Sequence, residues 1–100
     1  MRVVIEREEL VRGIQAVVDI VPSKSALPVL SNILIQATPD GIELSATDLD
    51  ISIVCGVAGK VEEPGDMTVT ARKFSEIVRE LPDESITLIA DEGRVTIERQ

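Results

Sequence analysis

Residues 67–81, MTVTARKFSEIVREL, change their hydrophobic period part-way along, and this change decides how the rest of the chain is interpreted. The first part, 67–71, is short and β-branched, which is typical of a strand. The second part, 72–81, has the apolar spacing of one helix face. The residues on that face are Phe74, Ile77, Val78 and Leu81. Thr70 is the predicted N-cap, and Pro82 ends the helix because it cannot donate a backbone hydrogen bond.

The same order of strand and helix occurs at the beginning of the chain. Residues 2–6, RVVIE, predict a strand, and residues 7–21 predict a helix that Pro22 ends. Its apolar face comprises Leu10, Val11, Ile14, Val17, Val18 and Val21. On its polar face, Glu8 and Arg12 stand four residues apart in the favourable order for an ion pair. We expect the small residues Gly13 and Ala16 to lie on the outer face of this helix, where the lack of large side chains would let a partner approach closely.

Further strands are predicted from runs of alternating or β-rich residues. They span 31–38, 42–47, 50–59, 84–91 and 94–100. Asp40 and Gly41 predict a hairpin turn after the first of these strands, and residues 60–66 read as a polar connection. In the strand over 50–59, the side chains expected to point inward are Ile51, Ile53, Cys55 and Val57.

The predicted order is therefore β-α-β-β-β followed by β-α-β-β. We expect an α+β fold, in which two helices pack on antiparallel sheet, as a single domain over residues 1–100. The second half lacks the last strand of the first half. A missing partner leaves an exposed strand edge, which invites pairing with another chain.

Composition excludes several classes of site. The 100 residues contain one cysteine and no histidine, which argues against a structural zinc site and against any imidazole-based catalytic triad. Neither glycine-rich phosphate-binding motif occurs, and Asp48 and Asp50 read as turn residues rather than metal ligands. We expect no catalytic residue, metal or cofactor. We also expect Cys55 to be a buried small hydrophobe, and the single cysteine favours the cytoplasm.

A net charge of −8 argues against nucleic-acid binding, but the charges are unevenly distributed. Segments 7–24 and 72–81 hold six basic and five acidic residues, whereas the rest of the chain holds four basic and thirteen acidic residues. If both helices cover the same face, one layer of the domain is basic-leaning and the other acidic. Arg72, Ser75 and Arg79 are expected on the solvent face of the second helix. Such charges are often merely solvated.

Several stretches together resemble the N-terminal domain of the bacterial sliding clamp, the β subunit of DNA polymerase III. They are MRVVIEREEL (1–10), ALPVLSNILIQA (26–37), IELSATDLDISI (42–53) and TARKFSEIVRELP (70–82). The most specific pieces are LPVLSN, TDLDISI and ARKFSEIVRELP. The similarity extends over nearly the whole chain, in order.

The resemblance implies a function that composition does not. Members of this family form a ring-shaped homodimer of three-domain chains that encircles double-stranded DNA, and they are processivity factors rather than enzymes. The helices line the hole, and the sheets form the outer wall. Polymerase III subunits and the clamp loader dock on a later domain, and no membrane is involved.

The resemblance also assigns roles to individual residues. Lys24, on a loop between Pro22 and Pro28, matches a basic position that faces DNA, and Arg72 and Arg79 match basic positions on the second helix. Arg7, Arg12 and Lys73 are further DNA-binding candidates. Ile77 and Leu81 lie on the helix that forms the subunit interface, together with the strand missing here. A rival interpretation is a self-assembling module that uses its open strand edge and does not bind DNA.

Overall fold

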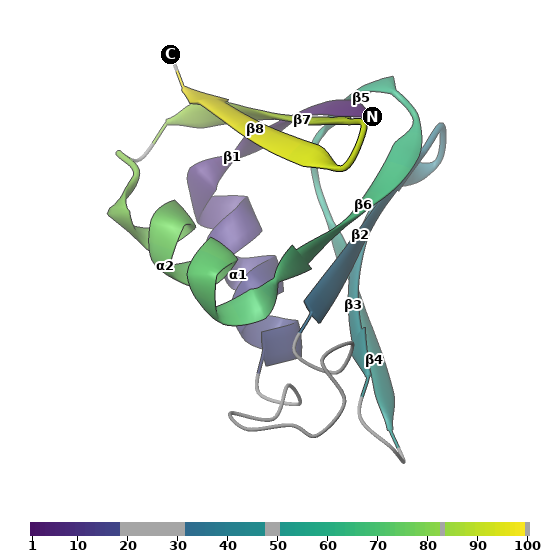
Figure 1. The fold of residues 1–100 in the computed structure, drawn as a ribbon, viewed down its shortest axis with the longest axis vertical. Helices are drawn as coiled ribbons and strands as arrows, with labels where there is room; N and C mark the ends of the chain where they lie inside the picture. Colours follow the sequence, from purple (N-terminus) through teal and green to yellow (C-terminus); the bar gives the residue numbers. More distant parts are fainter. Residues whose placement is uncertain (19–31, 48–50, 83, 100) are drawn as a thin grey trace.

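Two helices and two four-stranded sheets form the domain in a computed structural model that describes residues 1–18, 32–47, 51–82 and 84–99. The elements follow the predicted order, with one additional strand (Figure 1). They are β1 (Arg2–Glu6), α1 (Arg7–Val18), β2 (Asn32–Thr38), β3 (Gly41–Thr47), β4 (Ser52–Val57), β5 (Lys60–Glu63), β6 (Gly65–Thr70), α2 (Ala71–Glu80), β7 (Ser85–Asp91) and β8 (Arg94–Arg99).

All strand pairs are antiparallel. One sheet has the order β5-β1-β7-β8 and the other has the order β4-β3-β2-β6. Each helix follows a strand of one sheet and leads into a strand of the other sheet, so the two halves of the chain interlock. Figure 1 shows the sheets at an angle to one another, with α1 and α2 side by side within that angle. Both helices therefore lie in one layer, as predicted.

The core is aliphatic apart from one aromatic ring. Alternate residues of β1, β2, β3 and β7 are buried, which is the pattern of strands with one face on a core. The largest fully buried side chains are Ile5, Leu10, Ile14, Ile33, Ile35, Ile42, Leu44, Ile86 and Leu88. Phe74, at 4% exposure, brings α2 onto this cluster. The domain therefore depends on branched side chains for its packing.

The predicted open edge is present. Within the described residues, β8 pairs with β7 alone and is the last strand of its sheet. Glu92 and Gly93 form the turn between these strands, both with positive φ (48° and 79°). Two positive φ values match the turn type whose twist suits a two-residue hairpin. The edge of β8 therefore carries backbone groups that pair with no other strand of the described residues.

The interpretation of residues 60–66 as a connection was wrong. Residues Lys60–Glu63 form β5, which pairs with β1 and extends that sheet. Only Val61 in this strand is partly buried, because the strand lies at the sheet edge. A single apolar residue between charged neighbours gives no alternation strong enough to identify a strand from sequence.

Four predictions about single side chains also need correction. Ile51 precedes β4 and is 59% exposed, so it does not point inward. Cys55 is only half-buried. Ser75 is 7% exposed and belongs to the buried face of α2 rather than to its solvent face. Thr70 occupies the N-cap position of α2, but its side chain makes no capping hydrogen bond.

Gly13 was placed on the outer face of α1, and the structure places it inside. A Cβ at this position would lie 2.4 Å from Val57 Cγ1 and 2.9 Å from Leu44 Cδ1. The glycine therefore lets α1 approach β3 and β4 closely, which is a packing role. Ala16, by contrast, is exposed as predicted.

Candidate nucleic-acid interface

The exposed side of α2 carries the pair of arginines that the sequence singled out. Ala71, Phe74, Ser75 and Val78 form the buried side of the helix. Arg72 and Arg79 are exposed, and their spacing of seven residues is close to two helical turns, so they share one side of α2. Glu76, also exposed, lies one turn from each of them. The structure thus places these two cations together, with one carboxylate near them.

Lys73 and Ile77 lie along a different side of α2. Both line a groove whose other walls are β6 and β8, with Phe74 at its inner side. Ile77 is 41% exposed and is one of three large exposed apolar side chains among the described residues. Leu81 is half-buried against the core at the end of the helix. The structure therefore places Lys73 with the predicted interface residue Ile77 rather than with Arg72 and Arg79.

Arg7 is occupied by contacts within the domain. Its guanidinium donates hydrogen bonds from Nη2 to the carbonyl oxygen of Arg79, at 2.8 Å, and from Nε to that of Val78, at 3.4 Å. Arg7 is the first residue of α1, and these acceptors lie in the last turn of α2. The two helices thus run in roughly opposite directions, with the start of one beside the end of the other.

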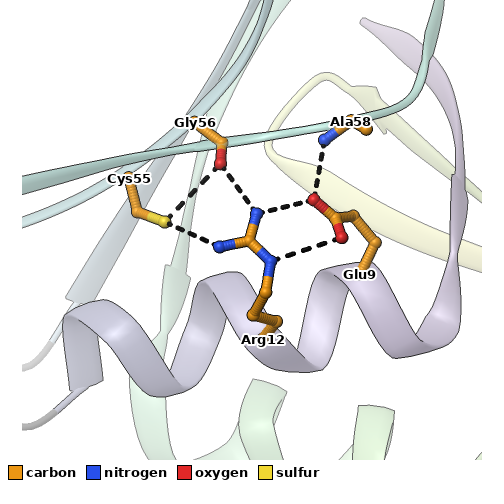
Figure 2. A network of polar contacts seen from close by, with 5 residues as sticks. All are labelled: Glu9, Arg12, Cys55, Gly56 and Ala58. Atoms are coloured by element: carbon orange, nitrogen blue, oxygen red, sulfur yellow. Dashed lines mark hydrogen bonds and ion pairs between the residues drawn. The ribbon is translucent and has the colours of Figure 1, made fainter.

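Arg12 belongs to a separate network that fastens α1 to the end of β4 (Figure 2). Its guanidinium pairs with the carboxylate of Glu9, at 2.6 Å for the shorter contact, and donates to the carbonyl oxygen of Gly56 at 3.0 Å. Its Nη1 lies 3.8 Å from the sulfur of Cys55. The expected ion pair between Glu8 and Arg12 is replaced by this pair, since positions three apart are also neighbours on a helix.

Charge and hydrogen bonding in this network shift two ionisation equilibria. The hydrogen bond from Arg12, together with one from the backbone N–H of Ala58 at 3.1 Å, lowers the pKa of Glu9 to about 2. The same carboxylate raises the pKa of Arg12 above its already high usual value. Both groups therefore stay ionised at neutral pH. The Arg12 side chain is held on the side of α1 that faces β4.

The remaining charges divide the surface in the way the sequence suggested. Many carboxylates on the strands and hairpin turns are exposed. Those in the described residues include Glu6, Asp40, Glu43, Glu62, Glu63, Asp66, Asp91, Glu92 and Glu98. The exposed arginine pair lies on α2, whereas these carboxylates lie on strands and turns; the described helices expose Glu8, Glu76 and Glu80. The helical layer is therefore less negative than the strands and turns.

Three of the candidate positions lie outside the described residues: Lys24, Asp48 and Asp50. In the part of the chain that is described, no group of three or more histidine, cysteine, aspartate or glutamate side chains could hold a metal ion. No helix within the described ranges is long and apolar enough to cross a membrane.

This arrangement places two adjacent helices against two antiparallel sheets, with exposed cations on the helical layer. The model for the family described as "DNA polymerase III beta subunit, N-terminal domain" matches residues 1–100. The chain belongs to this family.

Relatives and solved structures agree with this assignment. The chain is 38% identical to the beta sliding clamp of Chlamydia muridarum over 95 residues, which are 95% of this chain and 26% of that protein. It is 37% identical to the beta sliding clamp of Caulobacter vibrioides over 101 residues, covering 98% and 27% of the two chains. The chain thus spans about a quarter of the length of these curated relatives.

The fold is shared with solved structures of this family. The pol III beta structure from Caulobacter crescentus superposes with a TM-score of 0.93 at 37% identity, over all of this chain and 27% of that chain. The DNA polymerase sliding clamp from Bacillus subtilis gives 0.91 at 31% identity, over 100% and 29%. The α+β architecture that the sequence predicted is therefore the clamp fold.

Proposed function

We propose that this chain is the first domain of a DNA sliding clamp, a ring that encircles duplex DNA and tethers a replicative polymerase. The arginine pair Arg72 and Arg79, exposed on one side of α2 in the helical layer, carries the proposal. Family membership supports it, because the relatives are beta sliding clamps. The domain acts in the cytoplasm as a processivity factor and catalyses no reaction.

The mechanism is electrostatic and independent of sequence. Arg72, Arg79 and Lys24 contact phosphate oxygens, which carry no base information. Such contacts release counterions and weaken with salt, so they hold the ring around DNA without fixing it at one site. Lys73, beside the groove, is a poorer candidate for phosphate contact. Arg7 and Arg12 are engaged within the domain and serve mainly to hold α1 in place.

The proposed subunit contact lies on the side of α2 that carries Ile77, next to the open edge of β8. Ile77 and the groove between α2, β6 and β8 offer an apolar surface next to unpaired backbone groups of β8. In the proposed homodimer, this region, with Leu81 at its end, faces a domain of the second chain. Polymerase subunits and the clamp loader bind domains that follow this one.

A topological experiment tests the encircling function. The full-length clamp chain, of which this domain is proposed to be the first, is loaded on nicked circular duplex DNA. The complex is separated from free protein by gel filtration, and the DNA is then linearised. A ring remains on the circle and is lost from the linear form, because it slides off the ends. Equal retention on both forms would contradict encirclement, and no retention on either would favour an assembly module that does not bind DNA.

A further inference from the structure

The role of Arg7 can be defined more closely than its charge suggests. It is the first residue of α1, yet its backbone and its side chain both bond to the segment where α2 ends and β7 begins. Its backbone N–H donates to the carbonyl oxygen of Glu84 at 3.1 Å. Its guanidinium reaches the carbonyl oxygens of Val78 and Arg79. Arg7 thus spans both sides of the connection between α2 and β7.

The contact with Arg79 satisfies an acceptor that α2 cannot satisfy alone. The last carbonyl groups of a helix lack partners within it, and Leu81 leaves the helical conformation (φ −76°, ψ 148°) before Pro82. The Leu81 N–H serves only the carbonyl oxygen of Val78, at 3.2 Å. The carbonyl oxygen of Arg79 accepts its short bond from Arg7. A cation here is also favoured by the helix dipole.

We infer that Arg7 is a positioning residue for Arg79: by binding the backbone of Arg79 itself, it fixes the last turn of α2 and so aims that arginine at the phosphate backbone. The inference rests on the proposed function, since it concerns how a DNA-facing cation is held. It reassigns Arg7 from direct phosphate contact to a bond inside the domain. Among the described residues, no carboxylate forms an ion pair with Arg7, so its role is to donate to carbonyl groups.

The planar guanidinium is essential to this role. Arginine presents several N–H groups in a fixed fork, whereas a lysine ammonium is a compact charge on a flexible stem. Arg7→Lys therefore keeps the charge and removes the paired donation to two successive carbonyl groups. If Arg7 contacted phosphate directly, lysine would largely replace it, because a phosphate contact needs mainly the charge.

The test measures duplex binding by the full-length chain for Arg7→Lys, Arg7→Gln, Arg79→Ala and the double variant Arg7→Lys/Arg79→Ala. We expect both Arg7 variants to weaken binding, and the double variant to bind within about twofold of Arg79→Ala, because effects that act through one group are not additive. Arg7→Lys with wild-type affinity, or a double variant showing the full product of both losses, would overturn the inference.

Amide hydrogen exchange provides a readout that does not depend on DNA. Arg7→Lys should speed exchange at Leu81, whose N–H closes the last turn of α2, and leave the amides of β3 unchanged. Unchanged exchange at Leu81 would also overturn the inference. If Arg79→Ala alone bound duplex like the wild type, the proposed role of Arg79 would fail, and exchange at Leu81 would still decide whether Arg7 holds this turn.

Discussion

Gly13 tests how closely α1 packs on β3 and β4, because alanine at this position adds only one carbon atom. Gly13→Ala places a Cβ against Val57 and Leu44, at 2.4 and 2.9 Å. Overpacking of this kind costs about 1–3 kcal/mol, against a gain of about 1 kcal/mol from the better helix propensity of alanine. We therefore expect a net loss of stability of up to about 2 kcal/mol in urea denaturation.

Gly56→Ala is the matched control, because nothing lies within 4 Å of a Cβ at this position. Its free energy of unfolding should stay at or slightly above the wild-type value. A Gly13→Ala variant as stable as Gly56→Ala would show that α1 does not press on β3 and β4 as the structure indicates.

Glu9 provides a prediction of pH dependence. Its pKa in the folded domain is about 2, below the ordinary 4.5, because Arg12 and the Ala58 N–H stabilise the carboxylate. A depressed folded-state pKa contributes stability that is fully present above about pH 4.5 and is lost as the pH falls through about 2. A carbon-detected NMR titration should give a midpoint for Glu9 near 2 in the wild type.

Arg12→Gln is the control for that titration. It removes the largest cause of the shift, so the midpoint of Glu9 should move up toward its ordinary range. A wild-type midpoint near 4.5, or one that Arg12→Gln leaves unchanged, would rule out the network in Figure 2 as the cause.

At the scale of elements, the attachment of α2 depends on one ring. Phe74 is the only aromatic residue in the sequence and is 4% exposed. Phe74→Ala should cost about 3–5 kcal/mol, because the cavity is lined by side chains that cannot fully collapse into it. The loss would be measured as a fall in the urea midpoint at unchanged slope.

Ile77→Ala, on the exposed side of the same helix, is the comparison for Phe74→Ala. It should cost well under half as much, since Ile77 is 41% exposed. Equal losses in the two variants would mean that α2 is rotated relative to the structure described here.

Sequence reasoning located the elements wherever periodicity was strong. Both helices and every alternating strand were found, because burial of one face enforces the period of 3.6 or 2. β5 was missed because an edge strand with one partly buried residue leaves no such pattern. Ser75 was misplaced because its position on α2 borders the buried side of the helix, and only the packing of the folded domain decides that it is covered.

The site was predictable only in part, for a related reason. Arg72 and Arg79 are exposed on one side of α2 because their seven-residue spacing fixes it locally. The partners of Arg7 and Arg12 include backbone carbonyl groups 71, 72 and 44 residues away in sequence. Because every residue has a backbone carbonyl group, the sequence does not indicate which carbonyl groups these arginines bind.

At the scale of the whole molecule, the proposed binding of a polyanion requires an acidic chain to separate its charges into layers. Most exposed carboxylates of the described strands and turns lie outside the helical layer, which carries Arg72 and Arg79. The field near the helices is then less negative than the net charge of −8 suggests. We therefore predict that only cations of the helical layer contribute to duplex binding.

Arg2 and Lys60 provide the matched control for this prediction. Arg2 alternates with the buried Val3 and Ile5 and pairs with Glu62 at 3.0 Å, so it lies on the outer face of its sheet. Lys60, in the adjacent β5, is exposed and separated from Glu62 by one residue, which places it on the same face. Removing both changes the net charge as much as removing Arg72 and Arg79.

The most direct measurement is the salt dependence of duplex binding by the full-length chain. Plots of log affinity against log salt concentration are compared for the wild type, Arg72→Ala/Arg79→Ala and Arg2→Ala/Lys60→Ala. We predict that the slope for Arg72→Ala/Arg79→Ala is shallower by about 1.8, from about 0.9 per lost phosphate contact, and that Arg2→Ala/Lys60→Ala keeps the wild-type slope. Equal slopes for all three, or a shallower slope for Arg2→Ala/Lys60→Ala alone, would contradict this prediction.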